Sequence, residues 1–97
     1  MYLIREVFRT KPGKAKELVK KFKKAEPYFE KDGMKNYKLM TDIATTYWTV
    51  VVEFETEDLN DFVQATRSGP PQPELQEIMD GYIDLLEGGN REIYLLE

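Results

Sequence analysis

The chain contains neither cysteine nor histidine, and these absences exclude whole classes of chemistry. Without cysteine there can be no disulfide framework, thiolate zinc site or cysteine nucleophile. Without histidine, the commonest proton-transfer group near neutral pH is missing. No apolar run reaches the roughly 18 residues of a membrane-spanning helix, and residues 1–4 are too few to predict a secretory signal. We therefore expect a cytoplasmic protein with no membrane partner.

The 97 residues are 41% apolar and 12% aromatic. This length is typical of one compact domain, and the apolar share is sufficient for one hydrophobic core. No repeat or low-complexity segment divides the chain. The sequence therefore predicts a single domain over residues 1–97.

Charge is unevenly distributed within a net charge of −4. Residues 1–56 contain 12 Lys and Arg against 8 Asp and Glu, whereas residues 57–97 contain 2 against 10. The positive excess lies mainly in one expected helix, at Lys14, Lys16, Lys20, Lys21, Lys23 and Lys24. Such a stripe could contact nucleic-acid phosphates, but pairs with Glu17 at helical spacing are typical of a solvated face. Because the whole chain is acidic and has no nucleic-acid-binding motif, we predict no nucleic-acid partner.

The first half of the chain predicts a strand, a helix and a hairpin. Residues 2–9 are β-branched and aromatic, and a Lys-Pro-Gly turn follows them. Apolar residues then recur at helical spacing, and Pro27 is expected to end or kink this helix. Residues 34–42 and 45–55 predict two strands joined by a short connection. Apolar and polar residues alternate most clearly in the second strand. This alternation predicts a core-facing side formed by Trp48, Val50, Val52 and Phe54.

The second half predicts two helical segments and a last strand. Thr56 or Asp58 can cap the first of these helices. Prolines in residues 68–73 interrupt it, either as a lid or as a kinked connection. A further helix directs inward Leu75, Ile78, Met79, Tyr82, Leu85 and Leu86. Residues 88–90 are glycine-rich and are expected to end that helix, and residues 91–96 predict the final strand.

The order β-α-β-β-α-β predicts an α+β fold, the ferredoxin-like antiparallel sheet with helices on one face. The opposite sheet face is also partly apolar, through Leu3, Val7, Tyr47 and Val51. A face in contact with water normally shows cleaner polar alternation. We therefore expect a homodimer in which a second copy covers this face and buries roughly 1,200–2,000 Å² in total.

The chain resembles the dimeric α/β-barrel superfamily in four features: a first strand ending in Lys11-Pro12-Gly13, a charged helix, an aromatic hairpin and a split final helix. The chain is similar to its antibiotic biosynthesis monooxygenase-like and NIPSNAP-like domains, and in the latter an arginine precedes the turn at about the place of Arg5. The resemblance implies a barrel of two facing sheets, with a small-molecule pocket between sheet and helices in each protomer.

The resemblance includes monooxygenases that need neither metal nor flavin, so no cofactor and no metal are expected. Those enzymes share an asparagine, a tryptophan and a tyrosine as catalytic residues. This chain has Val50, Phe54 and Asn60 at the corresponding places, so these catalytic residues do not carry over. Haem-degrading members use a histidine ligand, which this chain lacks. Fold alone does not choose among the activities of such a superfamily.

The expected ligand pocket lies between the sheet and the helices, around the only tryptophan. Its candidate residues are Trp48, Phe54, Phe62, Met79, Tyr82 and Asn36. Aromatic walls hold flat ligands, and a tyrosine hydroxyl or an amide can fix their orientation. Ordinary core packing is the alternative, because aromatic and methionine side chains at helical spacing also build plain cores.

Charged residues inside the strands are the other candidates, because a charge there must be paired or reach water. Glu6 is expected to face the helices, where burial would raise its pKa and suit it as a general base. If strands one and three are neighbours, Arg5 and Glu53 share the opposite face and form an ion pair. That face, with Tyr47 and Val51, is the expected dimer contact.

Two functions remain open at this point. The first is binding of a small aromatic or carbonyl compound, with cofactor-independent monooxygenation or isomerisation as the activity that the resemblance implies. The second is a non-catalytic dimeric ligand-binding or assembly module, in which the strand charges stabilise the interface.

Overall fold

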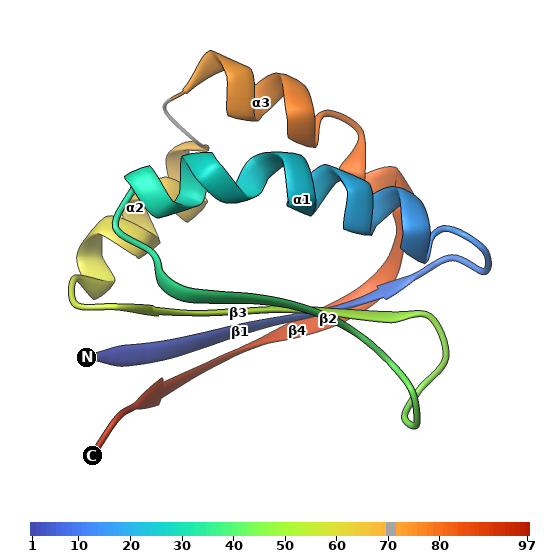
Figure 1. Cartoon of the computed structure of the whole chain (residues 1–97), viewed down its shortest axis with the longest axis horizontal. Coiled ribbons are helices and arrows are strands. Elements are labelled where there is room, and N and C mark those ends of the chain that lie inside the picture. Colours follow the sequence, from blue (N-terminus) through green and yellow to red (C-terminus); the bar gives the residue numbers. More distant parts are fainter. Residues whose placement is uncertain (70–71) are drawn as a thin grey trace.

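The computed structural model describes residues 1–69 and 72–97 and confirms the α+β, ferredoxin-like arrangement (Figure 1). One antiparallel sheet, in the order β2-β3-β1-β4, consists of β1 (Tyr2–Thr10), β2 (Lys35–Thr41), β3 (Thr49–Thr56) and β4 (Leu86–Leu95). The helical elements on one side of this sheet are α1 (Ala15–Lys31), α2 (Leu59–Ser68), α3 (Pro73–Met79) and the 3-10 helix η1 (Tyr82–Leu85). In the described ranges, no helix combines the length and apolar character needed to cross a membrane.

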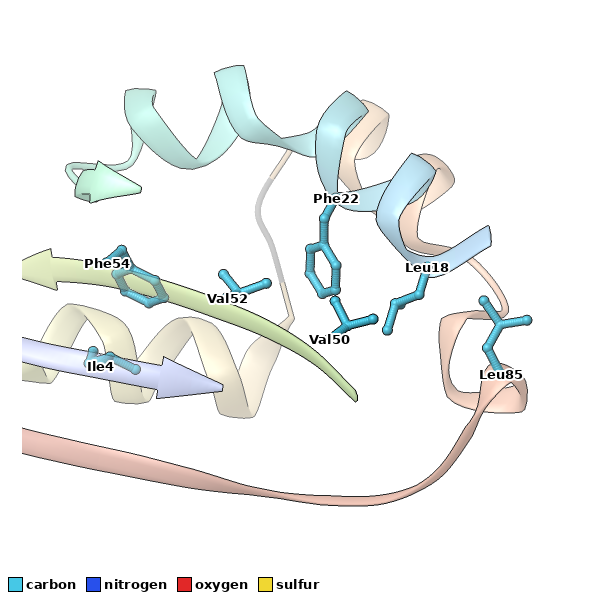
Figure 2. Close-up of a cluster of buried hydrophobic side chains, with 7 residues drawn as sticks. All are labelled: Ile4, Leu18, Phe22, Val50, Val52, Phe54 and Leu85. Atoms are coloured by element: carbon cyan, nitrogen blue, oxygen red, sulfur yellow. The ribbon is translucent and has the colours of Figure 1, made fainter. Parts of the chain in front are cut away.

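The core lies between the two central strands and α1. Its buried cluster comprises Ile4, Leu18, Phe22, Val50, Val52, Phe54 and Leu85 (Figure 2). Ile4 pairs with Phe54 and Glu6 with Val52 in the β1–β3 register, so alternate side chains of both strands point toward α1. The predicted core-facing positions of β3 are confirmed for Val50, Val52 and Phe54, because each is at most 3% exposed.

The first helix is longer than the sequence predicts. Pro27 neither ends it nor marks its last residue, since α1 continues to Lys31. A proline removes the amide that would bond to the carbonyl four residues earlier, here that of Lys23. Both Pro27 and Lys23 are exposed, so water can solvate that carbonyl. The next helix, α2, begins at Leu59 and is capped by Asp58, one of the two predicted caps, whose side chain accepts a hydrogen bond from the Asp61 amide at 3.1 Å.

The last predicted helix is wrong in its second half. α3 ends at Met79, Gly81 adopts a left-handed φ of 79°, and η1 follows before β4 begins at Leu86. The glycines expected to cap a helix are strand residues, and Gly88 and Gly89 pair with Arg9 and Phe8 of β1. Between α2 and α3, the predicted lid or connection includes residues 70 and 71, which lie outside the described residues.

Gly89 is required because the backbone of β1 passes very close to it. A Cβ atom there would lie 2.2 Å from the Val7 carbonyl oxygen, and the φ of 157° is rare for other residues. At Gly88 the nearest atom is a flexible one, Arg9 Nη2 at 3.2 Å. We predict that Gly89→Ala lowers the free energy of unfolding by about 1–3 kcal/mol, as overpacking does.

Gly88→Ala is the matched control and should change the free energy of unfolding by no more than about 0.5 kcal/mol. Urea denaturation of both variants measures the difference. Equal effects would show that the close approach of β1 and β4 at Gly89 is not a constraint on the fold.

Candidate functional site

An apolar space, which we call the helix-side hollow, lies between the sheet and its helices. Its volume is about 200 Å³, and its lining is mostly aromatic or sulfur-containing, with Phe8, Phe22, Phe29, Met34, Phe62, Met79 and Tyr82. The Phe8 ring stacks on Phe22 at 5.4 Å between centres and meets Tyr82 edge-on at 6.4 Å. These walls suit a flat, largely apolar ligand.

A larger groove of about 540 Å³ adjoins the helix-side hollow along α2. Four residues line both spaces, namely Asp32, Met34, Phe62 and Ala65. Helix α2 buries none of its residues fully, and Phe62 and Val63 are only half-buried. A helix with so little buried surface is expected to open locally more readily than α1, which has three buried residues.

The structure brings together three of the six predicted pocket residues. Phe62, Met79 and Tyr82 line the helix-side hollow, and Phe54 lines the adjoining groove from the core. The other two do not line the helix-side hollow: Trp48 lines a separate space beside α1, and Asn36 lines neither the hollow nor the groove. Asn36 is exposed at a shift in the β2–β3 register, and its Nδ2 donates to Glu55 Oε2 at 2.7 Å on the opposite side of the sheet.

Trp48 lies before β3 and not within it, so the prediction that it is a core residue of this strand is wrong. Its φ is 61°, and its side chain is 43% exposed. The Trp48 carbonyl accepts hydrogen bonds from the Thr10 amide and hydroxyl at 2.9 and 3.2 Å, and Asp42 Oδ1 accepts from the Thr49 amide at 2.9 Å. These bonds start the strand at Thr49 and break the alternation that the sequence shows through residues 45–48.

Glu6 faces the helices, as the alternation predicts. Its carboxylate pairs with Nε of Arg91, its register partner on β4, and only 16% of its side chain is exposed. Burial raises the pKa of Glu6, and the hydrogen bond and charge of Arg91 partly oppose that shift. Glu6 therefore lies on the helix-facing side as a carboxylate that takes up a proton more readily than an exposed one. It does not line the helix-side hollow itself.

Arg91 is the residue that the sequence interpretation missed. Its guanidinium carbon lies 5.0 Å from the centre of the Phe62 ring, so it connects Glu6 to a wall of the helix-side hollow. The signal that could have found it is the antiparallel register, which places Arg91 opposite Glu6 once β4 is known to begin at Leu86. Among the described residues, no three acidic, histidine or cysteine side chains gather closely enough to hold a metal ion.

The sheet face away from the helices, which we call the outer face, carries a row of alternating charges. The predicted pair is confirmed, because Arg5 Nη1 lies 3.3 Å from Glu53 Oε1. Lys38 of β2 lies 3.9 Å from Glu53, and Glu92 of β4 lies 3.9 Å from Arg5. Val51 also lies on this face, where it pairs with Val7. Tyr47 does not, because it lies in the β2–β3 connection and is 83% exposed.

Comparison with solved structures identifies the fold. An uncharacterised NIPSNAP domain protein from Burkholderia xenovorans superposes with a TM-score of 0.78 at 15% identity, over 100% of this chain and 95% of that one. A candidate antibiotic biosynthesis monooxygenase from Chloroflexus aurantiacus gives 0.76 at 13% identity, over 99% and 92%. The chain shares the fold of these proteins. The fold resemblance expected from the sequence is thus confirmed.

A NIPSNAP-like domain protein from Burkholderia xenovorans has higher identity, 23%, with a TM-score of 0.71 over 99% of this chain and 84% of that one. No protein-family model and no curated protein matches the sequence. At these identities the likeness establishes the NIPSNAP and monooxygenase-like fold, and the function has to be argued from this chain's own residues.

The raised pKa of Glu6 predicts a specific pH dependence of stability. Because the folded state disfavours the ionised form, Glu6 contributes stability below its ordinary pKa of 4.5 and loses it as the pH rises through the raised folded value. We therefore expect the free energy of unfolding of the wild type, minus that of Glu6→Gln, to fall as the pH rises from 4.5. Urea denaturation at a series of pH values measures this difference.

Glu92 provides a control of opposite sign. The pKa of Glu92 is lowered, mainly by a hydrogen bond from Tyr94. Glu92 therefore contributes to the stability of the folded state at pH values above its ordinary pKa of 4.5, and this contribution is lost as the pH falls. The difference between the wild type and Glu92→Gln should therefore rise with pH. The same slope for both variants would contradict the burial of Glu6 as the cause.

Proposed function

We propose that the protein is a cytoplasmic homodimer that binds a small aromatic or carbonyl compound in the helix-side hollow. The observation that carries this proposal is the hollow itself, an apolar space walled by aromatic rings with the Tyr82 side chain at its lining. Ligand sites are typically apolar clefts with a few polar groups that fix orientation. The adjoining groove supplies room for the polar part of a ligand.

Glu6 and Arg91 extend this proposal from binding to chemistry, although neither lines the hollow: they lie beyond its Phe62 wall, so a substrate would have to reach past this ring to meet them. A carboxylate with a raised pKa is suited to accept a proton from a carbon beside a carbonyl and return it to another position, which is an isomerisation. For a phenol substrate, loss of the hydroxyl proton precedes reaction with dioxygen to the quinone. One oxygen atom is bonded to the ring, the other leaves as water with the two hydrogens that the phenol loses, and the phenol supplies all the electrons. Arg91 lies beside Phe62, where its guanidinium can stabilise the developing negative charge.

A non-catalytic module is the second candidate, and two observations favour it. Glu6 is already paired with Arg91 across β1 and β4, which is a sufficient structural role for both residues. The hollow, at about 200 Å³, is also smaller than the roughly 300–1,000 Å³ of common ligand sites. Glu6→Gln discriminates between the candidates, because the catalytic one expects bound compounds to be converted by the wild type and not by the variant.

The ligand proposal predicts that closing the mouth of the helix-side hollow abolishes binding. Ala65 lines both the hollow and the groove, so Ala65→Trp would place an indole across the space. Asn60→Trp is the matched control, because Asn60 is exposed on the same helix and lines neither space. We expect Ala65→Trp to weaken binding at least about tenfold, a loss of roughly 1.4 kcal/mol.

Titration of isotope-labelled protein with a panel of phenols and aromatic ketones, followed by amide chemical shifts, measures this binding. Compounds that bind should shift residues of α2 and η1, and Asn60→Trp should leave their affinity unchanged. A panel without any binder, or binding that Ala65→Trp does not weaken, would contradict the proposed site.

The homodimer is proposed because the outer face combines apolar and paired charged residues. Val7 and Val51 are half-buried there, and Met40 and Tyr94 are 36% and 50% exposed. The charges on this face are already paired, so a facing sheet could cover them without leaving an isolated charge. A second copy that presents the same face would satisfy both the apolar surface and the charge row.

We predict that Val51→Glu converts the dimer into a monomer, because a carboxylate on the middle of β3 would be buried without a partner. Ile43→Glu is the control, since Ile43 is 98% exposed in the β2–β3 connection. Analytical ultracentrifugation of the three proteins measures the mass. A monomeric wild type, or a dimeric Val51→Glu, would show that this face is not the interface.

A further inference from the structure

A second space, which we call the hairpin hollow, lies between the flank of α1 and the connection from β2 to β3. The start of α1 and this connection lie at the same end of the molecule (Figure 1). Its volume is about 560 Å³, and Ala15 and Val19 of α1 form an apolar part of its lining. Tyr47 and Trp48 line it from the connection. It shares no lining residue with the helix-side hollow or the adjoining groove, so the two proposed sites are independent.

The backbone holds the Trp48 indole at the surface instead of letting it join the core. A left-handed φ of 61° is uncommon for a bulky residue, and such conformations persist only where the surroundings impose them. The surroundings here include Thr10, which is 1% exposed and whose amide donates to the Trp48 carbonyl at 2.9 Å, while its hydroxyl lies within hydrogen-bond distance of the Trp48 and Lys11 carbonyls. Tyr47, next to it, is 83% exposed. The hairpin hollow therefore has two aromatic side chains available for stacking.

Three lysines of α1 surround the same space. Lys16, Lys20 and Lys23 line the hairpin hollow, and in the described part of the chain none of them has an ion-pair partner. This distinguishes them from Lys14, which pairs with Glu17 at 3.3 Å. The one carboxylate in the lining is that of Asp42, and one of its oxygens already accepts from the Thr49 amide.

We propose that the hairpin hollow binds a nucleoside monophosphate, a compound that combines a flat aromatic base with an anionic phosphate group. The base would stack on Trp48, because aromatic side chains stack on the face of any base. The phosphate would pair with the three lysines, as ammonium groups bind phosphate. A sugar hydroxyl can donate to Asp42. The volume fits one nucleotide-sized compound, which favours a free nucleotide over a strand.

The single tryptophan makes the test direct, because intrinsic fluorescence reports on Trp48 alone. Adenosine monophosphate and uridine monophosphate should quench this fluorescence saturably at low salt, and added salt should weaken the binding. Adenosine without phosphate, and inorganic phosphate without a base, should each bind at least about tenfold more weakly. Amide chemical shifts should change in residues 15–23 and 41–48 and not in α2.

Matched lysine variants separate a built site from general attraction to a basic helix. Lys20→Gln should weaken nucleotide binding about tenfold, whereas Lys24→Gln should leave it unchanged, because Lys24 does not line the hairpin hollow. Trp48→Gly should fold, since glycine suits a φ of 61°, and calorimetry should show that it no longer binds the nucleotides.

Several outcomes would overturn the proposal. These are the absence of saturable quenching by both nucleotides, equal quenching by adenosine, and equal effects of Lys20→Gln and Lys24→Gln. Tighter binding of an oligonucleotide than of either mononucleotide would assign the surface to single-stranded nucleic acid. A blue-shifted emission that no nucleotide changes would show that a second copy covers the indole.

Discussion

The antiparallel pairing of β1 with β3 is the constraint on which the rest of the structure depends. In this register Ile4, Val50, Val52 and Phe54 lie on the side of α1, and they form one buried cluster with Leu18 and Phe22 of that helix, which lie beside Val50 (Figure 2). A shift by one residue would turn all of these side chains to the opposite face. The same register places Glu6 under the helices and Arg5 beside Glu53 on the outer face. Burial and charge pairing on both faces therefore follow from one alignment.

The helices do not cover the sheet evenly, and both spaces follow from this. α1 buries Leu18, Phe22 and Ala25 completely or nearly so, whereas α2 has no fully buried residue. The helix-side hollow lies where α2 stands over the sheet, next to Phe62. The hairpin hollow lies at the flank of α1, where the β2–β3 connection leaves the sheet. Rigid and loosely held elements thus meet at both candidate sites, as is common for functional regions.

Periodicity allowed most elements to be predicted, because burial of one face imposes a spacing of two in strands and of about 3.6 in helices. The element order, the core-facing residues of β3, the helix-facing side of Glu6 and the Arg5–Glu53 pair all follow from such spacing. The candidate pocket was predicted only in part. Phe62, Met79 and Tyr82 meet at the helix-side hollow, while Asn36 turns away at a register shift and Arg91 was missed.

The sequence by itself determined which side chains are buried together, since alternation and helical spacing are local properties that burial imposes on neighbouring residues. Only the tertiary structure decided where the alternation stops. Trp48 continues the apolar pattern of β3, yet its backbone is left-handed, its carbonyl accepts from the Thr10 amide of another strand, and its side chain is 43% exposed. Gly89 likewise belongs to a strand because Val7 of β1 lies against it. Both outcomes depend on contacts between residues far apart in the chain, which no local pattern contains.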